Sequence, residues 1–187
     1  HLGSDTDVPA GDIGVGAREI GYMTGMMKKL SNKTDCVFTG KGLSYGGSLI
    51  RPEATGYGDI YFAENMLAMR GETFEGKKCV ISGAGNVASF AAQKLMQLGA
   101  KVLTLSDRSG AIYCKDGLTE EMLQEIMVLK NVTRGELADF AKDKAGVAFY
   151  KGANSWQIAD QIDCAFPCAR QNELNGDDAA YLLKHGC

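Results

Sequence analysis

The chain has 187 residues, of which 45% are hydrophobic and 23% charged, and its formal net charge at pH 7 is −3. These values are typical of a globular protein and exclude the strongly basic composition of nucleic-acid-binding domains. The sequence also lacks the stretch of about 20 apolar residues that a membrane-spanning helix needs. We therefore expect neither a nucleic-acid nor a membrane partner.

Cysteine and histidine usage restricts the chemistry further. Six cysteines are scattered along the chain without a C-x-x-C pair, and the histidines lie only at positions 1 and 185. A disulfide framework is typical of small secreted proteins, so we expect free thiols and a cytoplasmic protein. Histidines at the two ends argue against a His-based metal site or a Ser-His-Asp triad, and we predict no metal cofactor. Because the sequence starts without methionine and stops directly after a predicted helix, we expect an internal fragment of a longer protein.

The first third of the chain predicts two helices and little other regular structure. Apolar residues recur at helical spacing over residues 18–30, and a short strand is expected at residues 36–39. The segment that follows is rich in glycine and serine. Pro52 suits the first turn of a second helix, which Gly71 ends.

From residue 79 onward, strands and helices alternate. Strands are expected at residues 79–82, 102–106, 147–150 and 162–166, with a short hairpin after the second strand and helices beginning after GAGN and near Thr119, Glu136 and Asp177. This order predicts an α/β fold with a Rossmann-like parallel sheet, truncated, and helices on both faces. Residues 72–187 would form this dinucleotide-binding domain, incomplete at its C-terminus. Residues 1–51 would end a preceding α/β domain, and residues 52–71 would form the helix that joins the two.

The segment GAGNVA at residues 83–88 predicts a ligand. It fits G-x-G-x-x-A, in which Gly83 permits a tight turn, Gly85 lets the backbone approach a pyrophosphate, and Ala88 lets helix and strand pack closely. The helix N-terminus that follows offers free N–H groups to phosphates. A second strand ends in Asp107, about twenty residues later, as the dinucleotide-binding fingerprint requires. A glycine-rich turn without a ligand is the alternative, but this context favours dinucleotide binding.

The residues alone leave the choice between NAD and NADP open. An acid at the end of the second strand, here Asp107, normally accepts a hydrogen bond from the ribose 2′-hydroxyl and favours NAD. Arg108 follows directly, and a guanidinium can hold a 2′-phosphate bidentately, which favours NADP.

Asp12, in the segment PAGDIGVGARE, has two interpretations. Aspartate is a favoured helix N-cap, and a helix does follow. The next four residues, Ile-Gly-Val-Gly, make a poor first turn, however, and the better helix formers begin near Ala17. A carboxylate left in a loop beside a cleft can instead exchange a proton with a substrate near neutral pH.

Longer motifs carry a resemblance to a known family. The segments DVPAGDIGVGAREIGYM, TGKGLSYGGSLIRPEATGYG, GAGNVA and PCARQNEL resemble glutamate dehydrogenases of the hexameric microbial type, over essentially the whole chain. The resemblance implies reversible oxidative deamination of L-glutamate to 2-oxoglutarate and ammonium, with hydride transfer to NADP rather than NAD. It also implies that residues 1–51 end a substrate (dimerisation) domain, that a cleft between the domains closes during catalysis, and that the full-length protein is a homohexamer.

The same resemblance implies roles for individual residues. Asp12 matches the catalytic aspartate, a general acid/base, and Gly11 beside it would offer backbone contact to the substrate. Lys130 matches a lysine that reaches the 2′-phosphate. Gln171 and Asn172 sit where the family approaches the nicotinamide ribose, although Arg170 beside them stands where the family has threonine. The residues implied in cofactor binding are Thr55, Gly83, Ala84, Gly85, Asn86, Val87, Asp107, Arg108, Lys130, Gln171 and Asn172.

Two other interpretations are open. The protein could be a leucine- or phenylalanine-type amino acid dehydrogenase, or a non-catalytic homologue that keeps the dinucleotide fold. The family's catalytic and carboxylate-binding lysines would precede residue 1, and a substrate-binding serine would follow residue 187, so these residues do not distinguish glutamate from another amino acid. We expect the isolated fragment to be inactive and prone to aggregate, because a truncated parallel sheet exposes an apolar edge.

Overall fold

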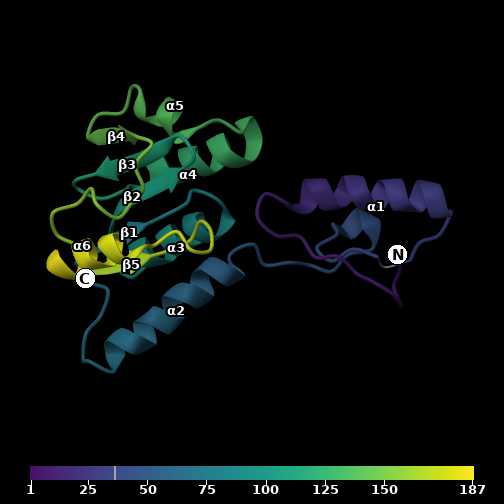
Figure 1. Ribbon diagram of the computed structural model, residues 1–187, viewed down its shortest axis with the longest axis horizontal. Coiled ribbons are helices and arrows are strands. Elements are labelled where there is room, and N and C mark those ends of the chain that lie inside the picture. Colours follow the sequence, from purple (N-terminus) through teal and green to yellow (C-terminus); the bar gives the residue numbers. More distant parts are fainter. Residues whose placement is uncertain (36) are drawn as a thin grey trace. The chain divides into compact units, whose positions relative to one another are not determined.

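The computed structural model describes residues 1–35 and 37–187 and divides into two compact units, His1–Arg51 and Pro52–Cys187 (Figure 1). In its described residues, the first unit contains one long helix and a single-turn 3₁₀-helix. The second unit contains the sheet and the remaining helices.

The first unit is built around α1 (Ala17–Ser31), which confirms the helix predicted at residues 18–30. Its N-cap is Gly16, whose N–H donates to the side chain of Glu19 at 2.9 Å. The 3₁₀-helix η1 (Leu43–Tyr45) follows later in the chain.

The prediction of a strand at residues 36–39 is wrong for residues 37–39, which do not form one. Cys36 lies outside the described residues. Val37 and Phe38 are buried with Ile20 of α1 in a small core, and the N–H of Thr39 donates to the carbonyl of Pro9 at 3.1 Å. The apolar residues of this segment therefore pack against a helix, and the described part of the chain holds no strand that pairs with them.

The second unit opens with α2 (Ala54–Ala68), followed by β1 (Lys78–Ile81), α3 (Asn86–Gln97) and β2 (Lys101–Asp107). The predicted strand, glycine turn, helix and second strand are thus confirmed. The elements after them are β3 (Gly110–Cys114), α4 (Glu120–Val128), the π-helical turn η2 (Leu129–Thr133), α5 (Leu137–Ala141), β4 (Val147–Lys151), β5 (Cys164–Phe166) and α6 (Gly176–Lys184).

These strands form one five-stranded sheet in the order β4-β3-β2-β1-β5 (Figure 1). The α/β class is confirmed, but the sheet is mixed rather than wholly parallel. β1 is parallel to β2 and β5, whereas β3 is antiparallel to both β2 and β4. Only Arg108 and Ser109 separate the paired residues Asp107 and Gly110, and such a short link allows a hairpin but not a parallel crossover.

Helices cover both faces of the sheet, as predicted. Successive residues of a strand point to opposite faces, and here Cys79 and Ile81 belong to one buried cluster while Val80 belongs to another. The first cluster includes residues of α3 and α4, and the second includes Trp156 and residues of α6. None of the helices within residues 1–35 and 37–187 combines the length and apolar character needed to cross a membrane.

Candidate functional site

The loop between β1 and α3 carries the glycine motif, and its two glycines meet different demands. Gly83 has a φ of +85°, and a Cβ there would lie 3.0 Å from the carbonyl oxygen of Cys168 and 3.3 Å from Cβ of Ala88. Gly85 is the N-cap of α3, and a Cβ there would meet no described atom within 4 Å. Gly83 is therefore required by the fold, whereas Gly85 leaves open space through which a ligand can reach the backbone.

The N-terminus of α3 is suited to bind an anion. Among the described residues, no side chain caps its first N–H groups, which carry the positive end of the helix dipole. Ala84 is buried, Val87 is half-buried, and Asn86 and Gly85 are exposed. Phosphate oxygens could thus accept hydrogen bonds from this turn without displacing a side chain.

Ser106 joins the ends of the two central strands beside this loop. The N–H of Gly83 donates to the hydroxyl of Ser106 at 3.0 Å, and the N–H of Ser106 donates to the carbonyl of Gly83 at 3.1 Å. Ser106 is 6% exposed. The glycine turn is therefore held rigidly at the carboxyl edge of the sheet.

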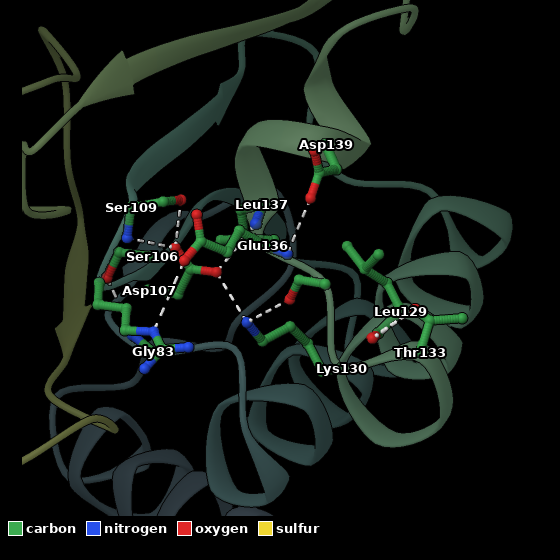
Figure 2. A network of polar contacts seen from close by, with 12 residues as sticks. Gly83, Ser106, Asp107, Ser109, Leu129, Lys130, Thr133, Glu136, Leu137 and Asp139 are labelled. Carbon is green, nitrogen blue, oxygen red and sulfur yellow. Dashed lines mark hydrogen bonds and ion pairs between the residues drawn. The ribbon is translucent and has the colours of Figure 1, made fainter.

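Asp107, at the end of β2, lies at the centre of a polar network (Figure 2). Its Oδ1 accepts hydrogen bonds from the N–H and the hydroxyl of Ser109, at 2.8 and 2.6 Å. Its Oδ2 accepts from Lys130 Nζ at 2.8 Å and from the N–H of Leu137 at 2.9 Å. One carboxylate thus connects the β2–β3 turn, η2 and the start of α5.

The electrostatics of Asp107 follow from these contacts. Its side chain is 8% exposed, against 22% for that of Lys130. Burial by itself raises the pKa of Asp107, but the hydrogen bonds from Lys130, Ser109 and Leu137 together outweigh burial and lower the pKa below its ordinary value. The carboxylate is therefore ionised at neutral pH, and four donors of the chain already occupy it.

The cationic residues predicted near the cofactor differ in their surroundings. The side chain of Arg108 is 86% exposed, and its Nε lies 3.7 Å from a carboxylate oxygen of Glu136. Lys130 instead points toward Asp107 (Figure 2), and its Nζ also donates to the carbonyl of Gly135 at 2.9 Å. The structure brings both residues to the edge that holds Asp107, but only Arg108 has its head group in solvent.

A cavity of about 600 Å³ opens beside the start of α3. It is lined by Val87 and by residues 167–174, the loop that follows β5. Gln171 and Asn172 are exposed on this loop, and Asn172 has a left-handed φ of +56°. The parallel pairing of β1 and β5 therefore places both predicted loop residues next to the glycine turn, as expected when parallel strands end at one edge.

Helix α2 approaches the same region, with Thr55 exposed in its first turn. A Cβ at the next residue, Gly56, would lie 2.6 Å from the carbonyl oxygen of Val87 and 2.7 Å from the backbone nitrogen of Ala91. The glycine therefore allows α2 and α3 to touch through their backbones. Thr55 stands beside this contact, close to the cavity-lining residue Val87.

Asp12 and Gly11 belong to the first unit. Asp12 does not cap α1, because the N-cap is Gly16, so the capping interpretation is wrong. The carboxylate is exposed, and one of its oxygens accepts the N–H of Ile13 at 2.8 Å. A Cβ at Gly11 would lie 3.0 Å from the carbonyl oxygen of Val15, so a glycine is needed for this tight loop.

Two polar residues at the sheet edge were missed by the sequence reasoning. Ser82, 1% exposed, directly follows β1 and precedes the glycine turn, and its hydroxyl donates to Glu173 at 2.8 Å. Glu173 directly follows the predicted loop residues in PCARQNEL. An acid next to the predicted loop residues was a usable signal, since a carboxylate within a loop can accept hydrogen bonds from nearby N–H and O–H groups.

Comparisons with known proteins identify the family. A family model described as glutamate/leucine/phenylalanine/valine dehydrogenase matches residues 46–187. The chain belongs to this family. Members at 56% and 55% identity, over 100% of the chain, are the NADP-specific glutamate dehydrogenases of Haemophilus influenzae and Escherichia coli. A crystal structure of Plasmodium falciparum glutamate dehydrogenase, 43% identical, matches 100% of the chain with a TM-score of 0.87.

The chain spans only part of these family members. It covers 41% of the length of the two bacterial relatives and 40% of the Plasmodium falciparum chain. The predicted resemblance to glutamate dehydrogenases is confirmed.

Proposed function

We propose that this chain is part of an NADP-dependent glutamate dehydrogenase, which interconverts L-glutamate with 2-oxoglutarate and ammonium. The observation that carries the proposal is the glycine turn and uncapped α3 N-terminus, in a chain 56% identical to a relative named NADP-specific glutamate dehydrogenase. The motif supports a dinucleotide site, and the name of the relative supports glutamate as the substrate.

The residues present fit a dinucleotide. The open space at Gly85 admits a pyrophosphate to the backbone, and the N–H groups of Asn86 and Val87 start an uncapped helix. The exposed amides of Gln171 and Asn172 stand across the cavity as hydrogen-bonding groups for the other end of the cofactor.

The surroundings of Asp107 support NADP over NAD. A site selective for NAD uses a free carboxylate to accept the ribose 2′-hydroxyl, and that carboxylate repels a 2′-phosphate. Here the Lys130 ammonium compensates the charge of Asp107, and four donors of the chain occupy its oxygens. Arg108 is mostly exposed beside it and can donate two parallel hydrogen bonds to a phosphate.

We assign the proton transfers to Asp12. NADP, when bound, supplies the hydride acceptor for the oxidation of the amino acid. The Asp12 carboxylate would accept and return protons at the substrate nitrogen and at the water that adds to the carbon bearing this nitrogen. The backbone of Gly11 would orient the substrate beside Asp12. An aspartate in a short loop with one oxygen anchored by the Ile13 N–H is held in place for this role.

The remaining proposals concern the whole protein. We propose a homohexamer in the cytoplasm without a catalytic metal. The leucine- or phenylalanine-type alternative is not favoured, because the relatives at 52–56% identity are named glutamate dehydrogenases. Intact Asp12, Gly83, Gly85 and Asn86 argue against a non-catalytic homologue, which is free to lose them.

The test is a steady-state assay of the full-length protein with 2-oxoglutarate and ammonium, using NADPH and then NADH. We expect oxidation of NADPH in preference to NADH. The variant Asp12→Asn should lose nearly all turnover while binding NADPH with unchanged affinity, because it keeps its shape but cannot exchange a proton.

The control is Asp5→Asn, an exposed aspartate of the same unit, which should retain full activity. Preference for NADH would contradict the argument from Asp107 and Arg108. A folded protein that turns over neither cofactor with 2-oxoglutarate would contradict the proposed reaction, and other 2-oxo acids would then identify the substrate.

A further inference from the structure

The loop at residues 167–172 contains neither helix nor strand, so its position must come from other contacts. It lines the cavity beside α3 and presents Gln171 and Asn172 to solvent. Such a loop contributes most to ligand affinity when it is already ordered before binding, because ordering the loop on binding would weaken the affinity.

One oxygen of Glu173 fastens this loop. Its Oε1 accepts the N–H of Ala169 at 3.1 Å and, at a longer 3.4 Å, the N–H of Arg170. The same oxygen accepts the hydroxyl of Ser82 at 2.8 Å. Glu173 is half-buried, and its carboxylate points back toward the loop residues that precede it.

Ser82 extends the connection to the sheet. Its hydroxyl oxygen accepts the N–H of Cys168 at 3.0 Å, and its own N–H donates to the carbonyl of Phe166 at 3.1 Å. Ser82 immediately precedes Gly83, so Glu173 and Ser82 together tie the loop after β5 to the turn after β1. The two segments lie directly beside each other, since a Cβ at Gly83 would lie 3.0 Å from the carbonyl oxygen of Cys168.

A further contact joins the loop to α2. The thiol of Cys168 donates to Asp59 of α2 at 3.9 Å. Burial, helped by the charges of Asp59 and Glu173, raises the pKa of Cys168 to about 12, so the group remains a thiol donor at neutral pH. The loop is thereby held from the sheet on one side and from α2 on the other.

We propose that Glu173 is a positioning residue that holds the loop at residues 167–172 where it contacts the nicotinamide half of the cofactor. This inference rests on the proposed function. Glu173 acts through the loop backbone and does not itself touch the cofactor. The adenosine half lies at the other end of the site, near Asp107 and Arg108, and does not depend on Glu173.

The geometry distinguishes an acceptor role from a role that needs negative charge. The contacts of Glu173 use a single oxygen that accepts from three donors. Glutamine offers an acceptor oxygen at the same place, whereas alanine offers none. Glu173→Gln should therefore keep the loop in place, and Glu173→Ala should release it.

The experiment measures binding of two ligands to the full-length protein by titration calorimetry. NADPH spans both halves of the site, and adenosine 2′,5′-bisphosphate spans only the adenosine half. For Glu173→Ala we expect the Kd of NADPH to rise about tenfold or more, since three hydrogen bonds that order the loop are lost. The Kd of adenosine 2′,5′-bisphosphate should stay within about twofold, and for Glu173→Gln both constants should stay within about threefold.

Two further variants complete the test. Glu120→Ala removes an exposed carboxylate from α4 and should change neither constant. Ser82→Ala removes the hydroxyl between Glu173 and Cys168 and should weaken NADPH selectively, so it decides the question if Glu173→Ala does not fold.

Several outcomes would overturn the inference. These are unchanged NADPH binding in Glu173→Ala, equal weakening of both ligands, or a glutamine variant as defective as the alanine variant. Wild-type protein that binds neither ligand would instead overturn the proposed function, so the two failures are distinguishable.

Discussion

The substitution Asp107→Asn keeps the shape of the side chain but changes what one end of it can do. The amide oxygen can still accept both hydrogen bonds from Ser109. The amide nitrogen then replaces Oδ2, and a donor faces two donors, Lys130 Nζ and the N–H of Leu137. Two contacts are therefore lost, one of which joins opposite charges.

The magnitude follows from those two contacts. Loss of a charge-assisted hydrogen bond costs about 1.5–3 kcal/mol, and a buried donor left without an acceptor costs about 1–3 kcal/mol. Lys130 keeps its bond to Gly135, and its side chain is 22% exposed, so water replaces part of the interaction. We therefore expect the free energy of local unfolding around η2 and α5 to fall by about 3 kcal/mol.

The measurement is hydrogen–deuterium exchange of the full-length protein, read from peptides that cover residues 129–141. A loss of about 3 kcal/mol should accelerate exchange there about 100-fold, since each tenfold step corresponds to about 1.4 kcal/mol. Asp116→Asn, at an exposed aspartate outside this network, is the matched control and should exchange like the wild type.

Exchange within about threefold of wild type would refute the reasoning, because a change below about 1 kcal/mol means that the network does not hold these segments. Selective loss of NADH affinity without faster exchange would show that Asp107 binds ribose instead. That result would also remove the structural support for NADP.

Two further predictions concern packing and pH. Gly56→Ala should destabilise the protein by about 2 kcal/mol, because overpacking costs about 1–3 kcal/mol and the backbone atoms of Val87 and Ala91 cannot rotate away. The control is Gly58→Ala, where a Cβ meets no described atom within 4 Å and no such loss is expected. Equal melting temperatures of the two variants would contradict this prediction. The folded-state pKa of Asp107 is lowered, so its contribution should be complete above about pH 4 and lost as the pH falls through the folded-state value. The difference in urea midpoint between wild type and Asp107→Asn should therefore shrink between pH 7 and pH 3, and a constant difference would contradict the assignment.

Much of the fold follows from local patterns. The helical spacing after residue 17, the glycine turn at residues 83–86 and the apolar runs around it each depend on neighbouring residues in the chain, so they are visible without the tertiary structure. The strand expected at residues 36–39 shows the limit, because an apolar run does not reveal whether it will pair with a strand or pack on a helix. The hairpin expected after the second strand, by contrast, is visible locally, because only two residues separate the paired Asp107 and Gly110.

The candidate site divides in the same way. Its glycine turn and its helix N-terminus are encoded within a few consecutive residues, and the sequence by itself determined both, together with the loop placement of Asp12. Only the tertiary structure decided how the charges are used. It brings Lys130 to Asp107, 23 positions apart, and Glu173 to Ser82, 91 positions apart. The first pair was expected to face the cofactor and the second was not considered, but both pairs hold the site together. Such pairings depend on which strands and loops become neighbours in the sheet, and side-chain hydrogen bonds over these separations leave no periodic pattern in the sequence from which they could be read.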